Sequence, residues 1–197
     1  MNDHQDRHAQ LVAAIAVRLP GRTVSFAKAA RLAYLADREA MRRHGFPVVD
    51  DQRVATPGGV AFCIGVLQAM QEGSNPELPA TGERTPGIRL FSTTEDMGCT
   101  VDDAVRDEDL DLFSRAEIDV IDDVVDRWGG RIDSLMSGTD VFPELHGLRS
   151  WMEVTEIAMF SALGDTNPQS SAERLEDHRR IDRLFESMRT PLTRINC

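Results

Sequence analysis

The chain has 197 residues, 41% of them hydrophobic, and a formal net charge of −11. A chain of this length buries enough apolar surface to fold without a disulfide or a metal ion, so we expect one globular domain with at most a short appendage. The negative charge disfavours direct nucleic-acid binding, which needs a basic face. The N-terminus lacks a basic signal-peptide start and no apolar run is long enough to span a membrane, so we expect a cytoplasmic protein.

Apolar residues at helical spacing predict a first helix over residues 3–19, which Pro20-Gly21 ends. A second helix is expected to begin after Thr23 or Ser25 and to run to Arg43. Gly45 and Pro47 then close it. Its last turn is rich in cations, which complement the negative end of the helix dipole.

The segment 47–59 is predicted to be an irregular connection, with helix resuming around Val60 and running to about Gln71. A long proline-containing loop follows. Two β-like runs, Ile88–Thr93 and Gly98 to Val101, predict a hairpin that has to lie on the helices to be stable.

Ser114 and Glu117 form a capping-box pattern that opens a strongly amphipathic helix ending at Gly129. Its polar face carries four acids, Asp119, Asp122, Asp123 and Asp126. The window from Glu95 to Asp126 holds 13 acids and two arginines, which equals the whole net charge of the chain. Such a face suits the steering of a basic partner, although a solvated surface that maintains solubility is the simpler interpretation.

A short helix is expected at 131–137, and the segment 139–151 is interrupted by proline and glycine. Helix returns over 154–163, and a final polar helix spans about 171–188. The predicted fold is therefore mainly α (α+β), a compact helical domain with a small β-hairpin packed on the helices. The predicted organisation is a helical domain over 1–165 and a C-terminal polar helix and tail over 166–197.

Asp37 is the charged residue whose position is least ordinary, because it follows the apolar run Leu32–Ala36. A carboxylate near an apolar face needs charge-assisted hydrogen bonds. Its possible partners are Lys28, Arg31, Arg38 and Arg53. We favour a structural ion pair with Arg53 that pins the helix to the following loop. The alternative is an enzyme or a small-anion site built from Asp37, Arg38, Arg53 and His146.

Other candidate chemistry has a simpler structural interpretation in each case. His4 and His8 are spaced like two ligands on a helix, but solvated surface is favoured over a metal site. His146, near Glu144 and Trp151, is interpreted as a structural histidine hydrogen-bonded beneath the tryptophan, with a general base as the alternative. Gly58-Gly59 is favoured as a tight turn over an anion site. We expect no catalytic residue, metal or cofactor.

The chain has three cysteines, odd in number and without a CxxC spacing, so reduced thiols are expected. Cys63 lies in the apolar run AFCIGVL and is predicted to be a buried small residue, with no role as a nucleophile.

Three stretches resemble the SocA-like Panacea domain of bacterial and phage proteins. They are LAYLADREAMRRHGFPVVDDQRVATPGGV (32–60), FSRAEIDVIDDVVDRWGG (113–130) and TDVFPELHGLRSW (139–151). Their order and spacing resemble the family pattern over about residues 11–163. The chain departs from that pattern at Gly59, where proline is usual, at Arg53, where an aromatic is expected, and at His146, which comes late after Thr139.

The resemblance implies a mainly helical domain that acts as an antitoxin and neutralises a toxin encoded beside it by direct binding. The positions that match the family pattern are Tyr34, Asp37, Arg38, Gly45, Pro47, Asp51, Ala55 and Gly59. The expected partner contacts are Tyr34, Asp37, Arg38, Arg53 and the four acids of the amphipathic helix. The residues expected to have a structural role are Gly45, Pro47, Asp51, Ala55, Gly58, Gly59, His146 and Trp151.

Because one branch of the family delivers its toxin to a Clp-type protease, a proteolytic adaptor or regulator from a phage or mobile element is the second hypothesis. The helix over 171–188 would be its handle, and packing or dimerisation is the simpler role for that helix. The sequence defines neither the toxin nor the oligomeric state.

Overall fold

A computed structural model describes residues 3–56, 61–73, 91–94, 98–103, 105–132, 142–149 and 151–189. The chain divides into two compact units, Met1–Val154 and Thr155–Cys197. Helices dominate the described residues and the strands are short, which confirms the predicted class of a mainly α fold with a small β element. Within these ranges no helix has both the length and the apolar character needed to cross a bilayer.

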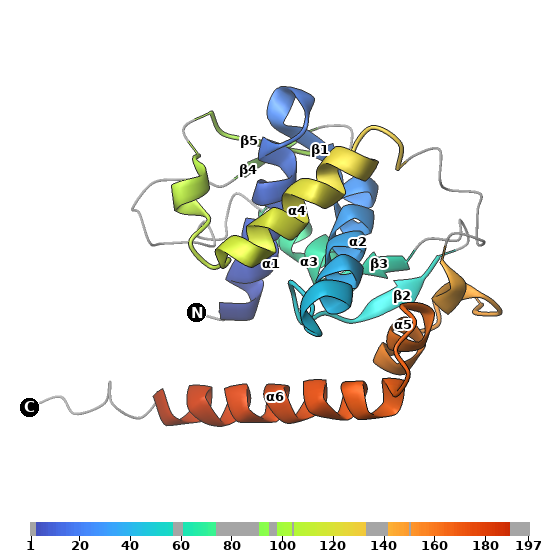
Figure 1. Ribbon diagram of the computed structural model, residues 1–197. Coiled ribbons are helices and arrows are strands. Elements are labelled where there is room, and N and C mark those ends of the chain that lie inside the picture. Colours follow the sequence, from blue (N-terminus) through green and yellow to red (C-terminus); the bar gives the residue numbers. More distant parts are fainter. Residues whose placement is uncertain are drawn as a thin grey trace, which may run out of the picture. The chain divides into compact units, whose positions relative to one another are not determined.

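The described residues of the first unit contain four α-helices: α1 (Asp3–Val17), α2 (Phe26–His44), α3 (Ile64–Gly73) and α4 (Arg115–Trp128). Helix α3 packs against α1 and α2, and α4 crosses the same two helices (Figure 1). Short 3-10 turns lie at Pro20–Arg22, Asp107–Asp109 and Pro143–Leu145.

Helix α2 is the centre of the first unit. Its residues from Ala29 to Asp37 are all buried, and small side chains such as Ala29, Ala33 and Ala36 allow neighbouring elements to come close. Ser25 caps its N-terminus by accepting a hydrogen bond from the backbone N–H of Lys28. At the other end, Gly45 adopts a left-handed conformation with φ 81°, which glycine reaches without steric cost. The predicted helix and its glycine stop are confirmed.

The predicted hairpin is confirmed in its described part as strands β4 (Phe91–Thr94) and β5 (Gly98–Val101), which pair antiparallel. Residues 88–90 of the first predicted run lie outside the described residues. Strand β1 (Thr23–Ser25), which the sequence pattern did not indicate, joins the other edge of β5. Three residues are too few for an alternating pattern to be detected.

A second antiparallel pair, β2 (Arg53–Ala55) and β3 (Ala61–Cys63), corrects two expectations. The connection expected to be irregular contains β2. The helix expected from around Val60 is wrong in its first turn, because residues 61–63 are a strand and α3 begins at Ile64. An apolar run such as AFCIGVL fits a buried strand and a buried helix equally well, and here it contains both.

The predicted capping box at the start of α4 is also confirmed. The Ser114 side chain accepts from the Glu117 backbone N–H, and the Glu117 carboxylate accepts from the Ser114 backbone. Val120, Ile121, Val124 and Val125 are its buried face. The short helix expected at 131–137 falls mostly outside the described residues.

The second unit contains α5 (Glu156–Ala162) and α6 (Pro168–Arg189), as the sequence predicted to within a few residues. Thr155 caps α5 through the backbone N–H of Ala158. The two helices pack through Leu175, which is buried, and through an ion pair of 2.8 Å between Arg179 and Glu156.

Candidate partner-binding site

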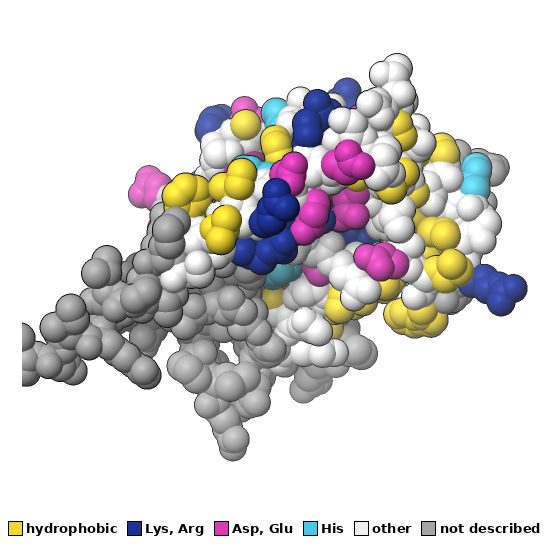
Figure 2. Space-filling view, turned by 90° about the horizontal axis from the view of Figure 1, so that it is seen from below, with side chains coloured by type: hydrophobic (Ala, Val, Ile, Leu, Met, Phe, Trp, Pro, Cys, Tyr) yellow, Lys and Arg dark blue, Asp and Glu magenta, His cyan; other side chains and the backbone are white. Residues whose placement is uncertain are grey.

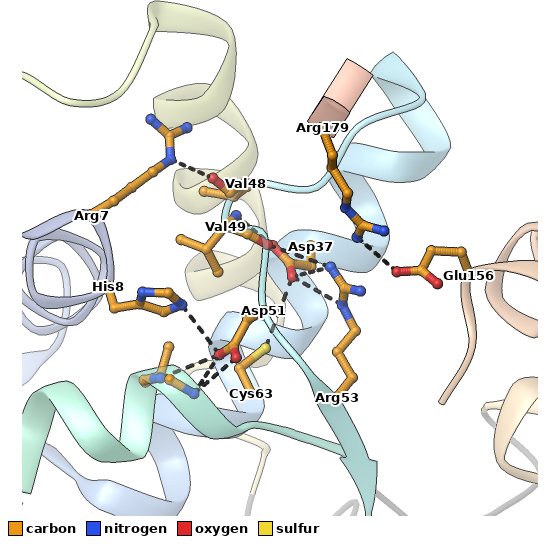
Figure 3. Close-up of polar contacts among 12 residues, drawn as sticks. Arg7, His8, Asp37, Val48, Val49, Asp51, Arg53, Cys63, Glu156 and Arg179 are labelled. Carbon is orange, nitrogen blue, oxygen red and sulfur yellow. Dashed lines mark hydrogen bonds and ion pairs between the residues drawn. The ribbon is translucent and has the colours of Figure 1, made fainter. Parts of the chain in front are cut away.

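Asp37 and Arg53 form an ion pair inside the first unit (Figure 3). The Asp37 side chain is 0% exposed and that of Arg53 is 1% exposed. Arg53 donates from Nη2 at 2.7 Å and from Nε at 3.1 Å to Asp37 Oδ2, while the backbone N–H of Val49 donates to Oδ1 at 2.9 Å. The predicted bridge is therefore confirmed: it joins α2 to the Val49 segment and to β2.

Burial raises the pKa of Asp37, and the Arg53 guanidinium and the Val49 N–H oppose that rise. The Cys63 thiol lies 4.0 Å from Asp37 Oδ2 in the same dry region. Burial and the Asp37 charge raise the pKa of Cys63 well above its usual value, so the thiol stays protonated. Cys63 is buried, as predicted.

Asp51 joins α1 to the start of α3. Its carboxylate accepts from the backbone N–H of Gly65 at 2.8 Å and from that of Val66 at 3.3 Å, and it lies 3.4 Å from His8 Nε2. Burial raises the pKa of Asp51, but His8 and the two N–H groups together lower it by more than burial raises it. The pKa of Asp51 is therefore below its usual value. The prediction that His8 is solvated surface is wrong, because the residue is only 7% exposed and faces Asp51. The fold brings α3 against α1, which the local sequence does not reveal.

Gly65 allows that close approach. A Cβ atom at this position would lie 2.7 Å from His8 Nε2, closer than real contacts permit. Of the two histidines spaced i, i+4, His8 is therefore explained by its packing against Gly65. No cluster of three or more metal-ligating side chains occurs among the residues that the structure describes.

Tyr34 and Arg38 hold the segment 142–149 against α2 through Glu144. The Glu144 side chain is 0% exposed, lies 2.6 Å from Arg38 Nε, and accepts a hydrogen bond from the Tyr34 hydroxyl. Burial and Glu144 raise the pKa of Tyr34 well above its usual value, so the phenol remains a neutral donor. Phe142 packs edge-on against Tyr34, with ring centroids 6.0 Å apart. In the sequence Glu144 lies close to His146, and no local pattern indicates its contacts with Tyr34 and Arg38.

The four residues of the alternative enzyme hypothesis do not form one open site. Asp37 and Arg53 are sealed from solvent, Arg38 pairs with Glu144, and His146 is exposed. Trp151 is 67% exposed, and the hydrogen bond of His146 beneath it stays a prediction.

The acidic face of α4 is exposed, yet three of its four carboxylates pair with arginines. Asp122 contacts Arg18, which follows α1. Asp123 lies 2.5 Å from Arg43 of α2, and Asp119 lies 3.0 Å from Arg115. Asp126 is exposed and forms no ion pair with any residue in the described ranges. The contacts of Asp122 and Asp123 hold α4 against the end of α1 and against α2, whereas the Asp119–Arg115 pair lies within α4. All three reduce the charge available to a partner.

Trp151 is the exposed residue with the least ordinary backbone. Its φ is 69°, a left-handed conformation that bulky residues rarely adopt. Its N–H donates to the Ala55 carbonyl at 2.7 Å, and the Ala55 N–H donates to the Met152 carbonyl at 2.8 Å. Met152 is 45% exposed, so two large apolar side chains lie together at the surface next to β2. Sequence alone gave no signal for this exposure.

The remaining motif residues are structural or lie outside the described ranges. Gly45 is the left-handed cap of α2, Pro47 is half-buried after it, and Ala55 is buried in β2. Gly58 and Gly59 lie outside the described residues, so the turn and anion-site interpretations stay predictions.

Comparison with protein-family models, with curated proteins and with solved structures found no match. The resemblance to the SocA-like Panacea domain therefore rests on the three sequence stretches alone. One departure from that pattern now has a physical role, because Arg53 stands where an aromatic is expected and is the buried partner of Asp37.

Proposed function

We propose that this chain is an antitoxin-like protein that neutralises a cognate toxin by direct protein–protein binding. The observation that carries the proposal is Trp151, a large aromatic that is 67% exposed on a left-handed backbone. Tryptophan is enriched among residues that dominate binding energy, and strained backbone conformations cluster at functional positions. Burial does not account for this residue, whereas contact with a partner does.

The distribution of charge supports the same proposal. The buried charges form ion pairs within the fold, which involve Asp37, Arg53 and Glu144, so they do not face a partner. The net charge of −11 therefore acts on partners mainly through exposed acids such as Asp126. An acidic surface accelerates encounter with a basic protein, and many proteins that act on nucleic acid or nucleotides are basic.

Neutralisation of this kind requires only that the toxin's working surface be covered. Trp151 and Met152 supply apolar area that becomes buried on contact, at about 25 cal/mol per Å² removed from water. The exposed acids steer and orient the partner. No covalent step enters this mechanism.

The test is co-expression with the product of the adjacent gene. We expect the neighbour to arrest growth when it is expressed alone, to be tolerated together with this protein, and to co-purify with it. A harmless neighbour, or one that fails to co-purify, removes the proposal.

A proteolytic adaptor is the second candidate, and α6 is the observation that favours it. Its C-terminal half exposes Ile181, Leu184 and Phe185, each 47–58% accessible, on one stripe of the helix. Acidic, basic and apolar side chains adjoin one another on the face shown in Figure 2. A mixed-charge helix with an apolar stripe is suited to docking in a groove.

The adaptor hypothesis is tested by retention of a Clp-type protease subunit on the immobilised protein. We expect retention by the full chain and loss when 166–197 is removed. Equal retention by both forms excludes α6 as the handle.

A further inference from the structure

We propose that residues 151–153 form an open β-edge that receives an extended segment of the protein partner. The inference rests on the proposed function and names the surface through which it operates. The segment runs antiparallel to β2, with Glu153 opposite Val54. The Ala55 N–H donates to the Met152 carbonyl, and the Val154 N–H donates to the Arg53 carbonyl, both at 2.8 Å.

This bonding pattern fixes the direction of the Glu153 backbone. In an antiparallel ladder, a residue whose two flanking neighbours carry the hydrogen bonds directs its own N–H and C=O to the opposite side. Glu153 is such a residue: it is exposed, and its backbone forms no hydrogen bond with any residue in the described ranges. One donor and one acceptor therefore point outward from the edge of the β3–β2 sheet.

Unpaired groups at a sheet edge are a template for strand addition. In this mode the main chain supplies hydrogen bonds and the flanking side chains supply specificity. Trp151 and Met152, at 67% and 45% exposure, lie directly before the open position. The left-handed turn at Trp151 places this aromatic at the end of the edge, where it limits how far an added strand extends.

The identity of Glu153 indicates which strand fits. Two copies of this chain paired through the same edge about a two-fold axis would place Glu153 opposite Glu153, and like charges directly opposite are destabilising. The edge therefore favours a different chain, with an apolar side chain against Trp151 and a basic or neutral residue opposite Glu153. This matches the basic partner that the net charge of −11 attracts.

The test compares three variants of the full chain for affinity to the purified product of the adjacent gene. Glu153→Pro removes the outward N–H without removing any internal hydrogen bond, since that N–H forms none within the described residues. Glu153→Ala is the matched control, because it keeps the N–H and loses only the side chain. Trp151→Ala removes the anchor.

We expect Kd to rise about tenfold or more for Glu153→Pro and Trp151→Ala, and to change less than about threefold for Glu153→Ala. If the wild-type chain binds and all three variants bind equally well, the edge is overturned while the proposed function stands. If the wild-type chain does not bind the neighbouring gene product, both the β-edge inference and the proposed function are rejected.

Amide hydrogen exchange on the wild-type protein decides the matter should Glu153→Pro fold poorly. The Glu153 amide is expected to exchange rapidly in the free protein and at least about tenfold more slowly in the complex. Unchanged exchange at Glu153 in a formed complex overturns the inference.

Discussion

The Asp37–Arg53 pair and the Trp151–Met152 segment reverse the usual distribution of residue types. A full ion pair lies inside the first unit with side chains 0% and 1% exposed, while a tryptophan at its surface is 67% exposed. Isolated buried charges are costly, and here each charge faces the other while the backbone of Val49 donates to Asp37 and accepts from Arg53. The buried charges of Asp37 and Arg53 therefore stabilise the fold, whereas the exposed side chain of Trp151 is the one available to a partner.

Loss of one charge from the buried pair gives the largest expected effect. Asp37→Ala leaves Arg53 buried without its carboxylate, and we expect a loss of about 3–5 kcal/mol of unfolding free energy. For a chain of this size the melting temperature falls by roughly 10 °C. Thermal unfolding followed by circular dichroism measures it.

The double variant Asp37→Leu, Arg53→Met is the control. Since it removes both charges, most of the lost stability is expected to return. An Asp37→Ala protein that melts like the wild type would show that the pair is not part of the framework.

Overfilling the contact between α1 and α3 is expected to have the next largest effect. In Gly65→Ala the new Cβ meets His8 Nε2 at 2.7 Å, so the buried imidazole has to move away from Asp51. We expect a loss of about 1–3 kcal/mol, measured by urea unfolding.

Adding His8→Ala to Gly65→Ala removes the obstructing ring and serves as the matched test. The loss from Gly65→Ala is expected to be smaller in the His8→Ala background than in the wild type. Equal losses in both backgrounds would mean that His8 does not require a glycine at position 65.

A third prediction concerns acid. Hydrogen bonds from Arg42 and Arg43 lower the pKa of Glu39 from 4.5 to about 2, against an opposing effect of burial. A carboxyl whose pKa is lowered in the folded state contributes stability above its unfolded pKa and loses that contribution as pH falls. Because Arg42 is half exposed, we expect only about 1 kcal/mol, lost between about pH 4.5 and pH 2.

The Glu39→Gln variant checks this assignment. Its stability difference from the wild type is expected to shrink on acidification through that window. A difference independent of pH over the same range would assign the contribution to packing.

The smallest expected effect on stability is at Trp151. Trp151→Gly relieves a left-handed backbone that costs a bulky residue about 1–2 kcal/mol, and glycine returns part of that gain as unfolded-state entropy. Since most of the side chain is exposed, few contacts are lost. We expect a melting temperature that is unchanged or slightly higher. A fall of more than a few degrees would show that the indole serves the fold.

The helices of this protein were predictable because their signals are local. The Ser114 cap, the Gly45 stop and the amphipathic pattern of α4 each lie within one helix and are confirmed. Of the two starts left open for α2, Thr23 and Ser25, the structure has Ser25 as the cap. The strands β1, β2 and β3 were not predictable, because each has three residues and is defined by a partner elsewhere in the chain.

In the candidate site, too, contacts between residues near in sequence were predictable and contacts between distant segments were not. The Asp37–Arg53 bridge followed from an acid beside an apolar run with an arginine 16 positions later. Glu144 lies 110 positions from Tyr34, and His8 contacts Asp51 only because α1 packs on α3. The exposure of Trp151 depends on the route of the chain beside β2, which residue type does not encode.

The most direct test of this division between framework and recognition is a paired measurement of melting temperature and of Kd for the neighbouring gene product. We expect the Asp37→Ala protein to lower its melting temperature and, at a temperature where it is still folded, to keep its affinity. Trp151→Gly is expected to keep its melting temperature and to weaken binding about tenfold or more. Wild-type affinity in Trp151→Gly, together with lost binding at unchanged stability in Asp37→Ala, would contradict the account.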